Sequence, residues 1–219
     1  MNKVLVFDLD DTLYKEIEFV SSAFNYITEY MWLRNRIDIS SLAKDLINDK
    51  RITLYDEMML KFDVSPQDFT LEKYLELYRF HYPKLNINKN LIALLKNLKK
   101  DGFKIGLITD GRYVTQRNKL HSLQIINFFD TIIISEETGI SKPHPHNYKL
   151  IESKFIESDV FYYIGDNTDK DFIYPSKNKK WLSICVLDNG LNIHQQDSKF
   201  IFDNHIETIS EITKLKEAL

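Results

Sequence analysis

Hydrophobic runs of strand length alternate with amphipathic stretches of helix length over most of this chain. The first run, Lys3–Phe7, is compact and apolar and includes β-branched residues, which is typical of a strand buried on both faces of a sheet. The same pattern predicts strands at residues 103–109, 131–135, 160–164, 181–187 and 200–202. Helices are expected at residues 91–98, 113–123, 145–154, 169–176 and 206–219. This alternation predicts an α/β fold, a Rossmann-like three-layer core in which a parallel sheet carries helices on both faces.

The segment after the first strand has a different pattern. Apolar side chains recur there at helical spacing, as at Ile17, Val20, Phe24 and Ile27. Strand-like alternation is absent, so we expect several amphipathic helices. A turn that begins at Asp63 is expected to lead into one of them, with Ser65 as its cap and the following proline in its first turn. The sequence therefore predicts a core domain of residues 1–13 and 84–219, interrupted by an all-helical domain of residues 14–83.

Composition narrows the function classes. The formal net charge is -3 and the basic residues are spread along the chain, so no nucleic acid and no membrane surface is expected as a partner. No stretch approaches the roughly 20 apolar residues that a membrane helix needs, and the first residues are too acidic for a signal peptide. Cys185 is the single cysteine and is expected to be a small buried side chain. These features predict a cytoplasmic protein.

Polar side chains follow four of the expected strands at the point where each strand ends. Asp8-Leu9-Asp10-Asp11-Thr12 follows the first strand, and Thr109-Asp110-Gly111-Arg112 follows the apolar run that ends near residue 108. Ser141-Lys142-Pro143 lies in the loop after the third strand, and an acidic loop from Gly165 to Asp171 follows the fourth. Ligands of open parallel sheets bind beyond the carboxyl ends of the strands, so we expect these loops to form one site.

The residue types in these loops suit phosphoryl transfer with a divalent cation. Carboxylates from two loops can bind Mg²⁺ through oxygen, and a hydroxyl, a lysine and backbone amides can bind a phosphate dianion. A carboxylate beside the metal can attack phosphorus and form an aspartyl-phosphate. A second carboxylate two residues away can protonate the leaving oxygen and then activate water.

The four loops resemble the motifs of the haloacid dehalogenase (HAD) superfamily and occur in that family's order. Asp8-Leu9-Asp10-Asp11-Thr12 resembles its first motif, DxDxT, and Thr109 resembles its strand-end serine or threonine. Lys142-Pro143 resembles its lysine motif, and Gly165-Asp166 followed by Asp171 resembles its acidic fourth motif. The resemblance covers the expected core domain. It implies a phosphatase-type hydrolase whose helical insert is a type 1 cap.

The resemblance also implies a role for each motif residue. Asp8 would be the nucleophile and a metal ligand. Asp10 would be the general acid and base, and its backbone carbonyl would be a further metal ligand. Thr109 would bind the transferred phosphoryl group, and Lys142 would stabilise negative charge on the nucleophile and the phosphate. Asp166 would bind the metal directly.

Three features of the site leave alternatives open. Asp171 is expected to support the metal site, through a water or Lys142, and Asp169 is the alternative second acid. Asp110 and Gly111 are expected to bind phosphate, although many relatives have asparagine in place of Asp110. Arg112 either binds a carboxylate or second phosphate of the substrate, or pairs with Asp110 or an acid of the cap.

The expected reaction is magnesium-dependent hydrolysis of a small phosphorylated metabolite, a phosphate monoester, through an aspartyl-phosphate at Asp8. Three alternatives stay open: a phosphomutase acting on a sugar phosphate, a metal-independent 2-haloacid dehalogenase, and a non-catalytic binding protein. Asp10 and Asp166 disfavour the dehalogenase, because dehalogenases of the family need no metal and lack the acid/base aspartate. His144 and His146 are expected on the surface rather than in a metal site. The protein is expected to be a monomer or a homodimer.

Overall fold

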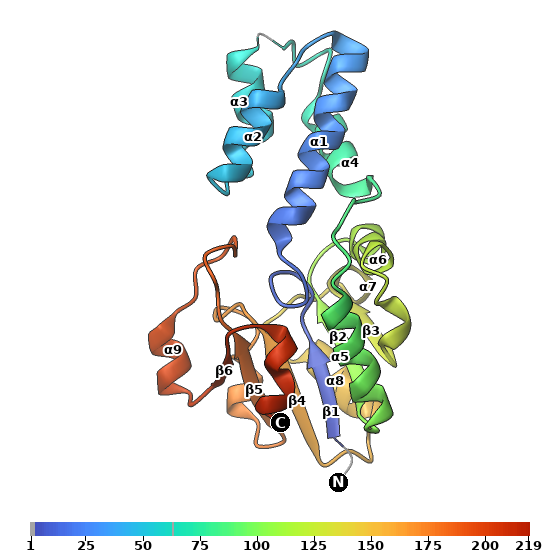
Figure 1. Ribbon diagram of the computed structural model, residues 1–219, viewed down its shortest axis with the longest axis vertical. Helices are drawn as coiled ribbons and strands as arrows, with labels where there is room; N and C mark the ends of the chain where they lie inside the picture. Colours follow the sequence, from blue (N-terminus) through green and yellow to red (C-terminus); the bar gives the residue numbers. More distant parts are fainter. Residues whose placement is uncertain (1–2, 63) are drawn as a thin grey trace. The chain divides into compact units, whose positions relative to one another are not determined.

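The computed structural model describes residues 3–62 and 64–219, and the chain divides into two compact units (Figure 1). One unit contains the chain up to Lys15 together with Ile87–Leu219, and the other is Glu16–Asn86. The first two residues of the predicted core domain lie outside the described residues. Each unit is described by itself.

The larger unit is built on a six-stranded parallel sheet with the strand order β3-β2-β1-β4-β5-β6, which confirms the predicted fold class. Its strands are β1 Lys3–Phe7, β2 Lys104–Thr109, β3 Thr131–Ile134, β4 Val160–Gly165, β5 Trp181–Val186 and β6 Glu207–Ile209. The chain places β2 and β3 on one side of β1 and then crosses to place β4, β5 and β6 on the other. The strand order therefore reverses beside β1, which is where ligands of such sheets bind.

The register of the central strands sets where the polar loops begin. Phe7 pairs with Leu107 of β2 and with Ile164 of β4. The Asp8 backbone N–H donates to the Ile164 carbonyl at 2.9 Å, which continues this pairing by one residue. The loops that follow β1, β2 and β4 therefore leave the same edge of the sheet at nearly the same level.

Helices cover both faces of the sheet, and Figure 1 shows α5 in front of it and α8 behind. The helical segments of this unit are α5 Lys89–Lys100, α6 Tyr113–Ser122, α7 Ser135–Thr138, α8 His146–Lys154 and α9 Ser198–Asp203, with short 3-10 segments at Ile126–Phe128, Pro175–Lys177 and Ile212–Glu217. Tyr148 and Ile151 of α8 pack with Val6 and Tyr163 of the sheet in a buried cluster. Cys185 is buried in β5, as expected.

The end of the chain differs from the prediction. Residues 200–202, predicted as a strand, lie in α9, because the Asp197 side chain accepts the backbone N–H groups of Lys199 and Phe200 and so caps a helix. Residues 206–219, predicted as one helix, contain β6 and a 3-10 segment instead. β6 is a three-residue edge strand, too short to show strand alternation.

The helix predicted at residues 169–176 is also absent, and turns followed by the 3-10 segment Pro175–Lys177 take its place. The Asp171 side chain points back along the chain and accepts the backbone N–H groups of Asp166 and Asn167. Backbone N–H groups that bond to a side chain in this way do not form helical hydrogen bonds, so these bonds hold the segment as a loop.

The smaller unit is all helical, with α1 Glu16–Asn35, α2 Ser40–Asn48, α3 Leu54–Lys61 and α4 Leu71–Phe80. Helix α1 packs against both α2 and α4. The predicted helix start at Ser65 is wrong, because Thr70 caps α4 by accepting the Lys73 N–H at 3.1 Å and Ser65 begins a turn. Of the turn predicted to begin at Asp63, only Asp63 lies outside the described residues. None of the helices in the parts of the chain described here combines the length and apolarity that crossing a bilayer requires.

Candidate active site

The polar loops meet at the carboxyl edge of the sheet through one buried lysine. The Lys142 ammonium lies 2.7 Å from Oδ1 of Asp8 and 2.7 Å from Oδ1 of Asp171. Burial alone would lower the pKa of Lys142, but the charges of Asp171 and Asp8 raise it well above its ordinary value. The lysine therefore stays charged and joins the loops that follow β1, β3 and β4.

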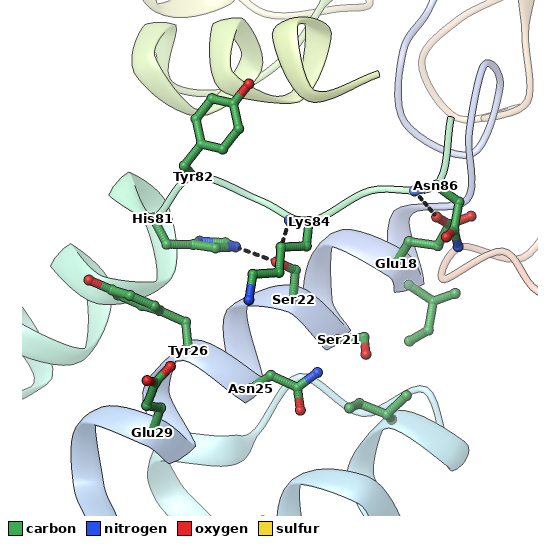
Figure 2. A pocket seen from close by; sticks show the side chains of 12 residues that line it. Glu18, Ser21, Ser22, Asn25, Tyr26, Glu29, His81, Tyr82, Lys84 and Asn86 are labelled. Atoms are coloured by element: carbon green, nitrogen blue, oxygen red, sulfur yellow. Dashed lines mark hydrogen bonds between the residues drawn. The ribbon is translucent and has the colours of Figure 1, made fainter. Parts of the chain in front are cut away.

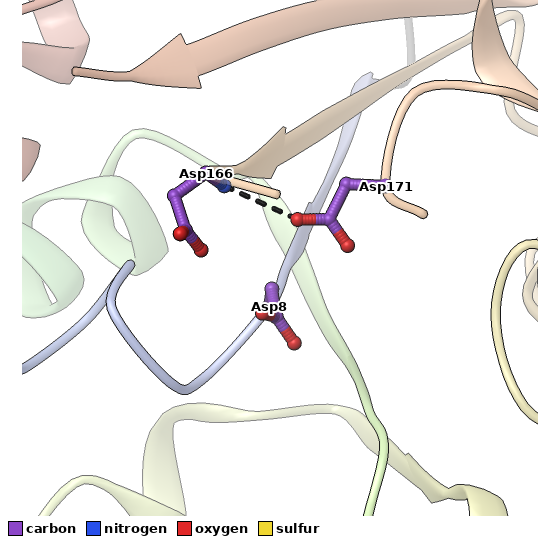
Figure 3. A group of neighbouring side chains, drawn as sticks. All are labelled: Asp8, Asp166 and Asp171. Atoms are coloured by element: carbon purple, nitrogen blue, oxygen red, sulfur yellow. Dashed lines mark hydrogen bonds between the residues drawn. The ribbon is translucent and has the colours of Figure 1, made fainter. Parts of the chain in front are cut away.

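Asp8, Asp166 and Asp171 form a buried acidic cluster (Figure 3). One carboxylate oxygen from each lies within 4.8 Å of the others. Burial and the neighbouring carboxylates raise the pKa of Asp166 to about 9, and burial raises the pKa of Asp8 to about 7 although Lys142 opposes it. Three buried carboxylates, only two of which pair with the Lys142 ammonium, fit a hard divalent cation, which binds oxygen ligands and offsets their charge.

Asp166 is held on both of its carboxylate oxygens. The Thr12 hydroxyl donates to Oδ1 at 3.0 Å, and the Asn192 side-chain amide donates to Oδ2 at 3.0 Å. Asn192 is itself fixed, since its backbone N–H donates to Asp188 and its side-chain oxygen accepts from Lys15. Such partners orient the ligands of a metal site and commonly affect metal affinity.

Asp171, rather than Asp169, is the acid that joins the cluster. Asp171 is fully buried and accepts hydrogen bonds from Lys142 and from the Tyr163 hydroxyl, whereas Asp169 is exposed. Its other oxygen accepts the backbone N–H groups of the loop after β4 at 3.1 Å and 2.9 Å. The structure therefore places Asp171 where it can fix both the lysine and the loop that carries Asp166.

Gly165→Ala is expected to disrupt this arrangement. A Cβ at this position would lie 2.8 Å from Cγ of Asp171 and closer still to Oδ2, so the Asp171 carboxylate would have to move. We expect a loss of about 1–3 kcal/mol in the free energy of unfolding, measured by denaturant titration. Gly106→Ala in β2 is the matched control, because its Cβ would meet the flexible end of the Ile151 side chain. Equal stability of the two variants would contradict the expectation.

Asp10 lies beside the cluster and has different partners. The Lys119 ammonium lies 2.7 Å from Oδ1, the Gln116 amide donates to Oδ2 at 2.9 Å, and the Tyr14 hydroxyl also donates to Oδ1. Burial acts to raise the pKa of Asp10, but the Lys119 charge and these hydrogen bonds hold it below its ordinary value. The two aspartates of the first motif are therefore in opposite environments, with the pKa of Asp8 raised and that of Asp10 lowered.

The loop after β2 carries the predicted phosphate-binding residues. Thr109 is buried at the end of the strand, and its hydroxyl accepts from the Gln116 amide at 2.6 Å. Oδ1 of Asp110 accepts the Lys142 backbone N–H at 3.1 Å, whereas its buried Oδ2 has no hydrogen-bond partner among the residues described and lies 3.9 Å from the Lys170 ammonium. The Gly111 N–H donates to the Ser135 hydroxyl at 2.9 Å. This loop is thus tied to the Lys142 loop and to α7.

Arg112 and the two histidines lie apart from the acidic cluster. The exposed Arg112 donates to Glu136 of α7 at 2.7 Å, an acid of its own unit, rather than to Asp110. His144 is exposed and His146 is half-buried. Neither belongs to the acidic cluster, the one group of possible metal ligands found among the described residues.

Sequence reasoning missed Gln116, Lys119 and Asn192. Gln116 and Lys119 are three residues apart in a predicted helix, and such a pair on one face is a signal that could have found them. Asn192 follows β5 in a loop of polar residues, and nothing in its sequence context marks it. All three are buried polar side chains that contact predicted site residues.

The helical unit contains a cavity of its own, of about 370 Å³, with both polar and apolar walls (Figure 2). The Ser22 hydroxyl links its walls by accepting the Lys84 backbone N–H at 2.8 Å and by contacting the His81 ring at 3.2 Å. Tyr26 lines the cavity and stacks on His81. Cavities of this size and mixed polarity suit small molecules.

Comparison with known proteins agrees with this geometry. Residues 5–179 match the model of the family described as haloacid dehalogenase-like hydrolase. The chain is 30% identical to a glyceraldehyde 3-phosphate phosphatase of Methanocaldococcus jannaschii over 234 residues, covering 100% of this chain and 99% of the relative. It is 26% identical to pyrophosphatase PpaX of Bacillus cereus, covering 76% of this chain and 75% of the relative.

The fold of this chain is similar to the folds of proteins whose structures have been solved. The crystal structure of the HAD-hydrolase YfnB from Bacillus subtilis matches with a TM-score of 0.71 at 17% identity, covering 100% of this chain and 98% of that one. The expectation of an enzyme is confirmed along with the fold. On the strength of the matching family model and a relative aligned over its whole length, this chain belongs to the haloacid dehalogenase-like hydrolases.

Proposed function

We propose that this protein hydrolyses the phosphate monoester of a small metabolite, with Mg²⁺, through an aspartyl-phosphate at Asp8. The observation that carries the proposal is the buried Asp8 carboxylate at the end of the central strand. It lies 2.7 Å from the Lys142 ammonium and within one acidic cluster with Asp166 and Asp171. A nucleophile, a cationic partner and a set of metal-binding oxygens are thus present together.

The proposed reaction has two halves. In the first, an Asp8 carboxylate oxygen bonds to phosphorus as the ester P–O bond breaks. Asp10, which takes up a proton once the phosphate dianion of the substrate lies beside it, gives that proton to the leaving oxygen. In the second, Asp10 takes a proton from water, whose oxygen bonds to phosphorus as the bond to Asp8 breaks. Thr109 and Lys142 hold the phosphoryl oxygens during both halves. The products are the free alcohol and inorganic phosphate.

Asp8, Asp166 and the Asp10 backbone carbonyl would hold the Mg²⁺, with Asp171 supporting the site through Lys142. The bound cation would offset the negative charge that the phosphoryl group and the nucleophile bring together. The Thr12 and Asn192 hydrogen bonds to Asp166 would keep its carboxylate in place for this purpose.

The substrate class follows from the relatives. One is named a glyceraldehyde 3-phosphate phosphatase and another a pyrophosphatase, so both glyceraldehyde 3-phosphate and pyrophosphate belong among the first compounds to test. We further propose that the helical unit, predicted at residues 14–83 and compact at Glu16–Asn86, acts as a cap that admits small substrates and excludes bulk water.

Removal of the metal tests the proposal directly. We expect release of inorganic phosphate from a panel of phosphorylated metabolites in the presence of Mg²⁺, and a loss of at least about 100-fold when a chelator is added. Asp166→Asn should mimic the chelator, because it removes one ligand charge, and excess Mg²⁺ should restore its activity only in part. Full phosphatase activity in chelator would contradict the metal-dependent mechanism.

The alternatives differ in their products. Conversion of a sugar phosphate to its isomer, without release of phosphate, would identify a phosphomutase. Halide release from a 2-haloacid in chelator would identify a dehalogenase, and Asp166 would then not be needed as a metal ligand. Failure of the whole panel with Mg²⁺ bound would favour a non-catalytic binding protein.

A further inference from the structure

The Asp10 carboxylate is held by two side chains of α6 that belong to none of the four motifs. The Lys119 ammonium lies 2.7 Å from Oδ1, and the Gln116 amide donates to Oδ2 at 2.9 Å. Tyr14 adds a further hydrogen bond to Oδ1. Both oxygens of the carboxylate therefore have donors, and its orientation is fixed from two directions.

Helix α6 brings these donors to Asp10 because it begins directly after the phosphate-binding loop. Gln116 and Lys119 are three residues apart and share one buried face of the helix. Gly111 has a φ of 141° and no side chain, and a Cβ there would lie 3.1 Å from the Gln116 side chain. Glycine at this position therefore lets the loop pass close to Gln116.

The Gln116 amide also connects two parts of the site. It donates to the Thr109 hydroxyl at 2.6 Å and to Asp10 at 2.9 Å. The proposed acid and base and the proposed phosphate-binding hydroxyl thus share one donor. A shift of either one would stretch its hydrogen bond to the Gln116 amide, so helix α6 holds their separation.

The Lys119–Asp10 ion pair is costly as a purely structural feature. The Lys119 side chain is only 4% exposed, so its ammonium has left bulk water, and this desolvation opposes folding. Apolar side chains of the same volume commonly give equal or greater stability. A buried lysine beside the proton-transferring carboxylate is better explained if it fixes the orientation of that carboxylate.

We propose that Lys119 and Gln116 are positioning residues that fix the Asp10 carboxylate for transfer of a proton to the leaving oxygen of the substrate. This inference rests on the proposed function and adds residues outside the family motifs to it. In the step concerned, the Asp10 O–H bond breaks and an O–H bond forms on the leaving oxygen. The electron pair of the breaking ester P–O bond stays on that oxygen.

The test compares two leaving groups. An alkyl phosphate has a strongly basic leaving oxygen that needs the proton, whereas 4-nitrophenyl phosphate releases a weakly basic phenolate that needs it little. With glyceraldehyde 3-phosphate, or the best alkyl phosphate of the panel, Lys119→Met should lower kcat about 100-fold with KM changed less than about 3-fold. The first-turnover release of nitrophenolate should fall less than about 3-fold. Lys119→Arg, which keeps the charge and donors, should recover most of the activity.

Lys99→Met is the matched control, since Lys99 forms a 2.6 Å ion pair with Asp130 in the same unit, away from the site. It should leave both activities unchanged. If Lys119→Met does not fold, Lys119→Gln, which keeps a donor but loses the charge, replaces it, with an expected loss of about 10-fold confined to the alkyl phosphate. Equal losses on the two esters, or an arginine variant no better than methionine, would overturn the inference alone. A wild type inactive on every ester would overturn the proposed function, and this inference with it.

Discussion

Asp8→Asn is expected to abolish turnover, with a fall in kcat of at least about 10⁴-fold, while the fold stays intact. The amide has the shape of the carboxylate but neither the charge nor the nucleophilic oxygen that bonds to phosphorus. The substitution also removes one of three neighbouring buried carboxylates, so the metal-free variant should be at least as stable as the wild type at neutral pH. Phosphate release and thermal unfolding measure the two effects.

Asp203→Asn is the matched control for this variant. Asp203 is exposed in α9, so the same chemical change is made outside the acidic cluster. It should leave kcat and thermal stability unchanged. Substantial phosphatase activity in Asp8→Asn, with the control unaffected, would show that another residue is the nucleophile.

The second large effect concerns stability and pH. In chelator, the free energy of unfolding is expected to fall as pH rises from about 5 to about 9. The folded protein holds Asp8 with a pKa of about 7 and Asp166 with a pKa of about 9, whereas the unfolded chain loses both protons near the ordinary value of 3.8. Stability from these two groups is therefore fully present below pH 3.8 and is lost as pH rises through the two folded values.

The expected size of this loss is on the order of several kcal/mol, since each pKa unit corresponds to about 1.4 kcal/mol. The lowered pKa of Asp10 acts in the opposite direction, but the stability that Asp10 contributes to the folded protein is lost only as pH falls below the ordinary value of 3.8. The two windows therefore do not overlap. Urea titrations at pH 5, 7 and 9 in chelator measure the effect.

Mg²⁺ and Asp166→Asn provide the controls. Saturating Mg²⁺ at pH 9 should recover most of the lost stability, because the cation binds the deprotonated carboxylates of the folded state. Asp166→Asn should weaken the pH dependence above pH 7, since the group titrating near 9 is gone. A stability that is independent of pH between 5 and 9 in chelator, or unaffected by Mg²⁺ at pH 9, would contradict the cation-site interpretation.

The sequence was informative where burial and strand pairing decide the structure. β1 was predicted with its observed bounds, since a run buried on both faces leaves a continuous apolar signal. The meeting of Asp8, Thr109 and Asp166 at one edge also followed, because parallel strands present their carboxyl ends together.

The prediction failed where a single polar contact decides the structure. The helix cap at Asp197 turned an expected strand into α9, and β6 was too short to show a period. Lys119 and Asn192 were missed because each contacts an aspartate that lies far away in the sequence and comes close only in the folded chain. Burial of a polar side chain is a property of the tertiary structure, and hydrophobic periodicity does not report it.

The pairing of Phe7 with both neighbouring strands makes the position of Asp8, the proposed nucleophile, depend on the register of the sheet. Its position is set by the alignment of three strands, so a slip of β1 by one residue would turn Asp8 to the opposite face of the sheet. The geometry of the proposed active site therefore depends on the packing of apolar residues such as Val4 and Val6. Changes in the hydrophobic core, far from any charged group, should appear in kinetic assays before they appear as unfolding.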